Sequence, residues 1–308
     1  MPKLNINKIK NNLAIDLQLY IEIIKDEYKD FISKERLDFL NSINDFKNII
    51  IIKNTGTISM FVRDNNIYFP TSAYKIINKM KFIPGFGINK NHKSFHKSNL
   101  IVNDNTFTDY IKHIFLAGVS VEQFYLETLL HETMHFCGVG GIGALREGIT
   151  ELKTRELAHK YNLTTSGCGY PKEIKIAIEL QNTFGQIIMN KIAFAKNDYE
   201  IVTILRDNFS FNEVNLYIEV SNLMEKEFQD KYYKHKFPGI TGPLKKIQKY
   251  NQLDYSEVFN VLDNYKQNKL EFKRMNKDIL STNKEDLLKV KKALLSVDED
   301  YNRNQKRK

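Results

Sequence analysis

Residues 120–137 read SVEQFYLETLLHETMHFC and place His131, Glu132 and His135 in the spacing H-E-x-x-H. Apolar residues fill most of this segment, which is typical of a buried helix. Side chains four residues apart lie on one face of a helix, so His131 and His135 can direct two imidazoles at one zinc ion. Glu132, one residue further round, then reaches a water on that ion. The stretch therefore predicts a buried helix that carries a hydrolytic metal site.

Two histidines leave a catalytic zinc site one protein ligand short, so a third is expected on the next element. Four glycines between positions 138 and 143 indicate a turn, and residues 144–161 have the apolar spacing of a second helix. Such a helix hairpin returns the first turn of the second helix to His135, which makes Glu147 the expected third ligand. Glu151, one turn further, is expected to hold the tautomer of a ligand histidine. The alternatives are a chance H-E-x-x-H on a metal-free helix and two ordinary solvated glutamates.

At these residues the sequence resembles the gluzincin metallopeptidases, the thermolysin-like enzymes in which a Glu on the following helix completes H-E-x-x-H. Residues 146–151, REGITE, are similar to the Asn-Glu-x-x-Ser-Asp of that second helix, with Arg and Glu in place of its Asn and Asp. The resemblance covers about residues 121–157. Only 11 residues separate His135 from Glu147, fewer than in the best-known members, which leaves room for a glycine turn but for no inserted subdomain.

The resemblance implies a zincin-like core and a zinc-dependent peptidase. It implies one Zn²⁺ per chain, held by the two histidines and Glu147, with Glu132 as the general base for the zinc-bound water. An endopeptidase is favoured, because the sequence contains no segment like the Gly-Ala-Met-Glu-Asn with which aminopeptidase relatives hold a free amino terminus. Peptidases of this kind place a Tyr or His near the zinc to stabilise the oxyanion. Tyr170 is the first candidate here, with Tyr161 and His159 as alternatives.

The rest of the chain predicts an α+β fold that is mostly helical. β-Branched runs at Ile49–Ile52 and at residues 58–62 predict a hairpin, and a third strand is expected at residues 67–69. In zincins such a sheet offers an edge strand to an extended substrate, and simple packing is the alternative. The expected regions are 1–117 with the small sheet and a basic loop, 118–195 with the helix hairpin, and a helical C-terminal region 196–308.

The composition is that of a globular protein, since 42% of the 308 residues are hydrophobic. The net charge of +9 is spread along the chain and forms no basic stripe, so a peptide or protein is the expected partner and nucleic acid is not. One alternative is a basic helical nucleic-acid-binding or regulatory protein that uses a Lys-rich loop and tail and carries a non-catalytic H-E-x-x-H helix. Another is a zinc hydrolase of non-peptide substrates. The oligomeric state is not indicated.

The remaining histidines and cysteines do not suggest a second site. Cys137 and Cys168 form no C-x-x-C pair, and two cysteines in a chain of this length favour free thiols, with a bridge as the alternative. His92 and His96 have ligand spacing but lie in a polar stretch, where a solvated loop is expected. No apolar segment has the length of a signal-peptide core or a membrane span, so a cytoplasmic protein is expected, with export by another route as the alternative.

Overall fold

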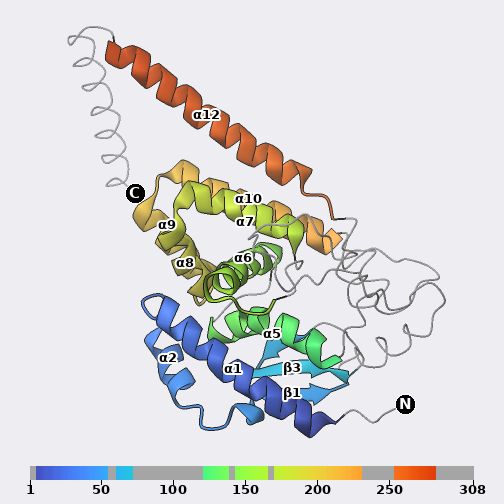
Figure 1. Ribbon diagram of the computed structural model, residues 1–308. Helices are drawn as coiled ribbons and strands as arrows, with labels where there is room; N and C mark the ends of the chain where they lie inside the picture. The colour runs from blue at the N-terminus through green and yellow to red at the C-terminus, as the bar shows by residue number, and fades with distance from the viewer. Residues whose placement is uncertain are drawn as a thin grey trace, which may run out of the picture. The chain divides into compact units, whose positions relative to one another are not determined.

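The computed structural model describes residues 5–54, 60–71, 121–138, 143–165, 170–230 and 253–281 (Figure 1). Over these residues the chain is mostly helical with one three-stranded sheet, as the sequence predicts. It divides into two compact units, Met1–Val258 and Phe259–Lys308. All the candidate site residues lie in the first unit.

The N-terminal elements are α1 (Ile6–Tyr28), α2 (Lys34–Asn41), the short 3₁₀ helix η1 (Phe46–Asn48), β1 (Ile50–Lys53), β2 (Phe61–Arg63) and β3 (Asn66–Pro70). The helices that follow are α5 (Val121–Cys137), α6 (Ala144–Tyr161), α7 (Pro171–Phe184), α8 (Gln186–Phe194), α9 (Asp198–Asn208), α10 (Phe211–Glu227) and α12 (Ser256–Ser281). The predicted second helix, residues 144–161, coincides with α6.

The sheet has the strand order β1-β3-β2. The strand β3 pairs with β1 in parallel and with β2 in antiparallel register. The expected hairpin between the first two strands is therefore wrong, and the hairpin joins β2 to β3 instead. Its turn contains Asp64 and Asn65 at φ 48° and 56°, the positive values that a tight turn between antiparallel strands requires at both positions. The β-branched runs located the strands, but they carry no information on which strand takes the centre.

One hydrophobic core is shared by α1, the sheet and α5 (Figure 1). Asn5 caps the start of α1, because its side chain accepts a hydrogen bond from the backbone of Lys8. The helix buries an apolar residue every three or four positions. On α5, the ring of Tyr125 meets Phe69 of β3 edge to face, and its hydroxyl donates to the carbonyl of Pro70 at 2.8 Å. The first half of α5 is thereby fixed to the sheet, ahead of H-E-x-x-H.

The helices α6 and α7 approach each other closely at a glycine. A Cβ on Gly148 would lie 2.5 Å from the carbonyl oxygen of Glu173, so only glycine fits there without movement of α7. The helix α6 ends at Asn162 in the left-handed conformation, and α7 begins with Pro171 at its first position. This packing sets the start of α7 beside the first turns of α6.

Several predictions concern residues outside the described ranges. They are the loop with His92 and His96, Cys168, the boundary between residues 117 and 118, and the Lys-rich tail. The other predicted boundary, between residues 195 and 196, lies between α8 and α9 within the first unit. Cys137 is a buried free thiol at the end of α5. Among the helices of the described ranges, none combines the length and the apolar character needed to cross a bilayer.

Candidate metal centre

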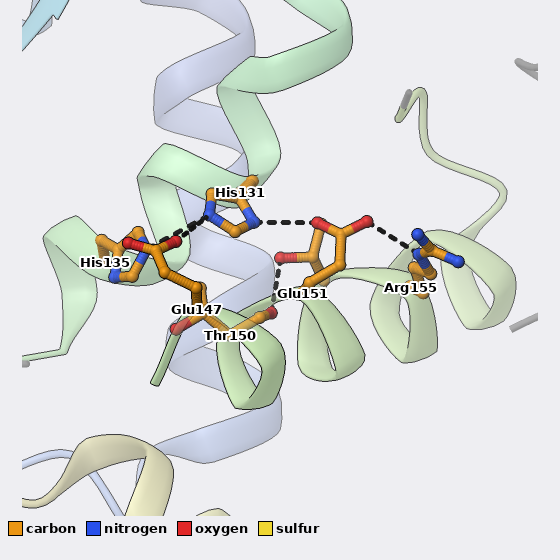
Figure 2. A network of polar contacts seen from close by, with 7 residues as sticks. His131, His135, Glu147, Thr150, Glu151 and Arg155 are labelled. Atoms are coloured by element: carbon orange, nitrogen blue, oxygen red, sulfur yellow. Dashed lines mark hydrogen bonds and ion pairs between the residues drawn. The ribbon is translucent and has the colours of Figure 1, made fainter. Parts of the chain in front are cut away.

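Three side chains from two helices converge on one point. His131 and His135 lie one turn apart on α5, and Glu147 faces them from the first turn of α6 (Figure 2). Nε2 of His131, Nε2 of His135 and Oε2 of Glu147 are each 3.2 Å from the other two. The three side chains are 10%, 18% and 25% exposed, so the cluster is largely enclosed but retains an open side. The structure therefore brings together the three residues that the sequence singled out as ligands.

The size and chemistry of this triangle fit a zinc ion. Ligand atoms about 2.0–2.1 Å from a tetrahedral zinc lie roughly 3.3 Å from one another, close to the observed 3.2 Å. Nδ1 of His131 faces a carboxylate oxygen and donates its proton to it in a hydrogen bond. With a metal bound, Nε2 of His131 would carry no proton and would offer its lone pair to the ion. His131, His135 and Glu147 can hold Zn²⁺ and leave its fourth position to water or substrate.

A carboxylate and a guanidinium support the first histidine from behind. Oε2 of Glu151, one turn after Glu147, accepts a hydrogen bond from Nδ1 of His131 at 2.9 Å (Figure 2). Oε1 of Glu151 accepts from Nε of Arg155 at 2.7 Å, and the two side chains are 3% and 2% exposed. The sequence predicts Glu151 at this position but does not single out Arg155. The signal that could have found Arg155 is its spacing of four residues from Glu151 on one helix.

Tyr170 lies against the cluster from the start of α7. Its ring stacks on that of His131, with centroids 5.5 Å apart and planes 21° from parallel. Burial raises the pKa of the Tyr170 hydroxyl, and the charges of Glu147 and Glu132 together with a hydrogen bond to Glu147 raise it further. The hydroxyl is thus a neutral donor. The backbone of Tyr170 is in the left-handed conformation, at φ 50° and ψ 49°, which costs a residue other than glycine about 1–3 kcal/mol.

The other candidate oxyanion donors, Tyr161 and His159, and Arg146 do not take part in the ligand triangle. Tyr161 donates its hydroxyl hydrogen to Glu27 of α1 at 2.8 Å, and His159 is exposed at the end of α6. Arg146, in the position where the gluzincin motif has Asn, donates from Nη2 to the carbonyl of Ala195 at 3.1 Å. The Arg146 side chain therefore ties α6 to the end of α8.

The charged groups of the cluster stabilise positive charge at its centre. Burial alone would lower the pKa of His131, but hydrogen bonds to Glu147 and Glu151 outweigh it and raise that pKa to about 10. Burial also favours a neutral Glu147, yet His135 and the bonds from both imidazoles bring the pKa of Glu147 below its usual range. The cluster is thus suited to a cation, whether proton or metal.

Glu132 has a different environment from the ligand carboxylate. The residue is 9% exposed, and burial raises the pKa of its carboxyl, while the charges of His131 and His135 oppose that rise. A raised pKa makes a carboxylate a better proton acceptor near neutral pH. Glu132 therefore has the burial and the neighbours of a general base.

No protein-family model, curated protein or solved structure matches this chain. What the site does must follow from its own atoms. It combines a triangle of ligand atoms that could hold a metal ion, the buried carboxylate of Glu132 and the neutral hydroxyl of Tyr170. Those are the parts that hydrolysis of a carbonyl compound by activated water requires.

Proposed function

We propose that this chain is a zinc-dependent peptidase of the gluzincin kind with a zincin-like core. The observation that carries the proposal is the triangle of Nε2 of His131, Nε2 of His135 and Oε2 of Glu147, with sides of 3.2 Å. The ligand set of two His and one Glu is the set of thermolysin-type catalytic zinc sites, which keep a position open for chemistry. The partial exposure of His135 and Glu147 leaves room for a substrate carbonyl.

The side chains around the triangle have separate tasks in the proposed reaction. Bound zinc supplies a Lewis acid that makes water acidic near neutral pH and polarises the carbonyl. Glu132 accepts a proton from the attacking water and returns it to the leaving amine. Tyr170 donates a hydrogen bond to the carbonyl oxygen as it becomes negative. Glu151 keeps the Nε2 lone pair of His131 directed at the ligand triangle.

A strand edge is available for the substrate backbone. Among the described strands, β1 and β2 form the two edges of the sheet, and β2 also packs against α5. In gluzincins an extended substrate lies along an edge strand, so we assign this role to β2. Binding of a peptide in the middle of its length suits an endopeptidase, which is the activity we propose.

Metal analysis and a peptide-library digest test the proposal together. We expect about one zinc per purified wild-type chain and cleavage at internal peptide bonds. Glu147→Ala is expected to lose the metal, because two histidines alone bind zinc weakly. Glu132→Gln is expected to keep the metal and to lose about 10²–10⁴-fold in cleavage rate, the usual contribution of a general base. Cleavage at the wild-type rate by Glu132→Gln would remove Glu132 from the mechanism.

The same experiment, together with nucleic-acid binding measured at several salt concentrations, separates the rival functions. Full zinc occupancy without cleavage of any library peptide points to a hydrolase of another substrate. A protein without zinc, whose binding to nucleic acid weakens steeply with salt, points to the nucleic-acid-binding alternative. The Lys-rich stretch 90–97 and the tail 301–308, on which that alternative depends, lie outside the described residues.

A further inference from the structure

The hydrogen bonds around His131 continue one step beyond Glu151. Figure 2 shows His131 between the carboxylates of Glu147 and Glu151, with Arg155 on the far side of Glu151. Glu151 uses one oxygen for each neighbour: Oε2 accepts from Nδ1 of His131 at 2.9 Å, and Oε1 accepts from Nε of Arg155 at 2.7 Å. Glu147, Glu151 and Arg155 are spaced four residues apart, so one face of α6 presents all three in a row.

We propose that Arg155 is a positioning residue that acts through Glu151 on His131 and so sets the affinity and coordination geometry of the metal site. The proposal rests on the metal site of the proposed function but not on peptidase activity. In Figure 2 the bond of Arg155 runs to Glu151, and through that carboxylate Arg155 acts on His131. Because that carboxylate is held at both oxygens, it cannot rotate away from Nδ1 of His131.

Burial makes this arrangement stiff. Arg155 is 2% exposed and Glu151 3% exposed, so water has little access to either charge. An unpaired buried carboxylate is costly, and the bond from the Arg155 guanidinium both compensates the charge of Glu151 and fixes the plane of its carboxylate. Partners behind a ligand histidine typically change metal affinity by about 10–100-fold when they are removed.

The charge of Arg155 and its hydrogen bond act on the metal in opposite directions. A positive group near the site weakens the attraction for Zn²⁺, so removal of the charge alone would tighten metal binding. Removal of the hydrogen bond lets the carboxylate turn and frees the ring of His131, which loosens metal binding. The loss of the hydrogen bond outweighs the loss of the charge, so the net effect of removing Arg155 is weaker metal binding.

The same helix contains a matched control. Lys153 is fully buried and forms an ion pair with Glu156 at 2.9 Å and a hydrogen bond with Gln181 at 2.6 Å. These partners are not part of the ligand cluster. Lys153→Met therefore removes a buried charge from α6, as Arg155→Met does, without touching the support of His131.

The experiment measures the dissociation constants of Zn²⁺ and Co²⁺ by chelator competition, with thermal unfolding as a check on the fold. We expect Arg155→Met to bind metal about 10–100-fold more weakly than wild type. Arg155→Lys keeps the charge but not the guanidinium geometry, so we expect a smaller loss of about tenfold or less. Lys153→Met is expected to lose stability and to keep its metal affinity within about threefold. The absorption bands of the Co²⁺-loaded protein should shift in the Arg155 variants only, because they report the orientation of the ligands.

Three outcomes would overturn the inference: unchanged or tighter metal binding in Arg155→Met, an equal loss in Lys153→Met, and a wild-type chain that binds no metal. If Arg155→Met does not fold, Arg155→Lys answers the same question through its Co²⁺ spectrum. The peptidase proposal is tested by a different outcome. A wild-type chain that binds zinc tightly but cleaves no peptide would contradict the peptidase activity and would not contradict the role of Arg155. Normal cleavage together with unchanged metal affinity in both Arg155 variants would overturn only the inference.

Discussion

Both ring nitrogens of His131 have polar neighbours, and these neighbours determine the orientation of the imidazole. Nδ1 donates to Glu151 at 2.9 Å, while Nε2 lies 3.2 Å from its counterpart on His135. Tyr170 stacks on the same ring and restricts its rotation. Three neighbours, one each from α5, α6 and the start of α7, thus define the orientation of one imidazole, which a single substitution can test.

We predict that Tyr170→Phe separates the stacking role of this residue from its hydroxyl role. Phenylalanine keeps the ring on His131, so zinc content should stay at the wild-type level. Loss of the hydroxyl should lower kcat about 10²–10³-fold, the usual cost of removing one oxyanion donor, with little change in KM. Steady-state kinetics on a cleaved library peptide measures both constants. An unchanged kcat would show that another group stabilises the oxyanion.

Two close contacts hold the helices that carry the site. At Gly148 the backbone of α6 approaches α7, and Tyr170 stands at the start of α7. At the end of α5, Nη2 of Arg36 donates to the carbonyl of Phe136, and Nη1 donates to Oδ1 of Asn65 at 2.6 Å. The first contact sets the position of α7, and the second satisfies a carbonyl that the last turn of α5 leaves without a helical partner.

Gly148→Ala is expected to destabilise the protein by about 1–3 kcal/mol, because the new Cβ overlaps the backbone of Glu173. Displacement of α7 should also lower the cleavage rate by moving Tyr170. Chemical denaturation measures the free energy of unfolding. Gly143→Ala is the control: its Cβ would be 3.5 Å from the nearest atom, a side-chain oxygen of Glu225, so we expect a change within about 0.5 kcal/mol.

Arg36→Ala is expected to cost about 2–3 kcal/mol of unfolding free energy, since it removes charged hydrogen bonds from a half-buried guanidinium. That group also lies over the rings of Phe39 and Phe136, at 4.6 and 4.8 Å from their centroids. Arg63→Ala serves for comparison, because its ion pair with Asp64 is about three-quarters exposed at 74% and 75%. Such exposed ion pairs contribute little to stability, so the free energy of unfolding of Arg63→Ala should be within about 0.5 kcal/mol of the wild-type value. Equal losses in both variants would show that Arg36 does not stabilise the end of α5.

The site lies where α5 meets α6 within the first unit. The helix α5 packs against α1 and the sheet, and α6 packs against α5, α7, α8 and α10 and contributes Leu157 and Ala158 to the shared core. A metal held by both helices would add a further link between α5 and α6. Its binding energy should appear in the stability of the folded chain, because the unfolded chain does not bring the ligands together.

We predict that zinc at about 100 times its dissociation constant stabilises the wild-type protein by about 2.7 kcal/mol. For a unit of this size the gain corresponds to a rise in Tm of roughly 5–10 °C. Differential scanning calorimetry with zinc and with a chelator measures the shift. The Tm of Glu147→Ala should be the same in zinc and in chelator, because this variant lacks the third ligand. A wild-type Tm that is the same in zinc and in chelator contradicts metal binding at these ligands.

The sequence predicted local features well where a local pattern is sufficient. Helical spacing after the glycine turn placed α6 at its observed bounds. The sequence did not predict the strand order, because β-branched residues favour any strand and the central place of β3 depends on pairing with β1 and β2 and on packing against α5. The left-handed Tyr170 was equally unpredictable, since tertiary contacts maintain a conformation that its own residue type disfavours.

By itself, the sequence determined that two histidines share a helix face and that a carboxylate begins the next helix, because helix periodicity relates such residues within one segment. Only the tertiary structure decided the rest. It brought three ligand atoms to 3.2 Å from one another, stacked Tyr170 on His131, and placed Arg155 behind Glu151. The physical reason is that distances between segments depend on how closely helices pack. Here the lack of a side chain on Gly148 allows α7 to approach α6 closely.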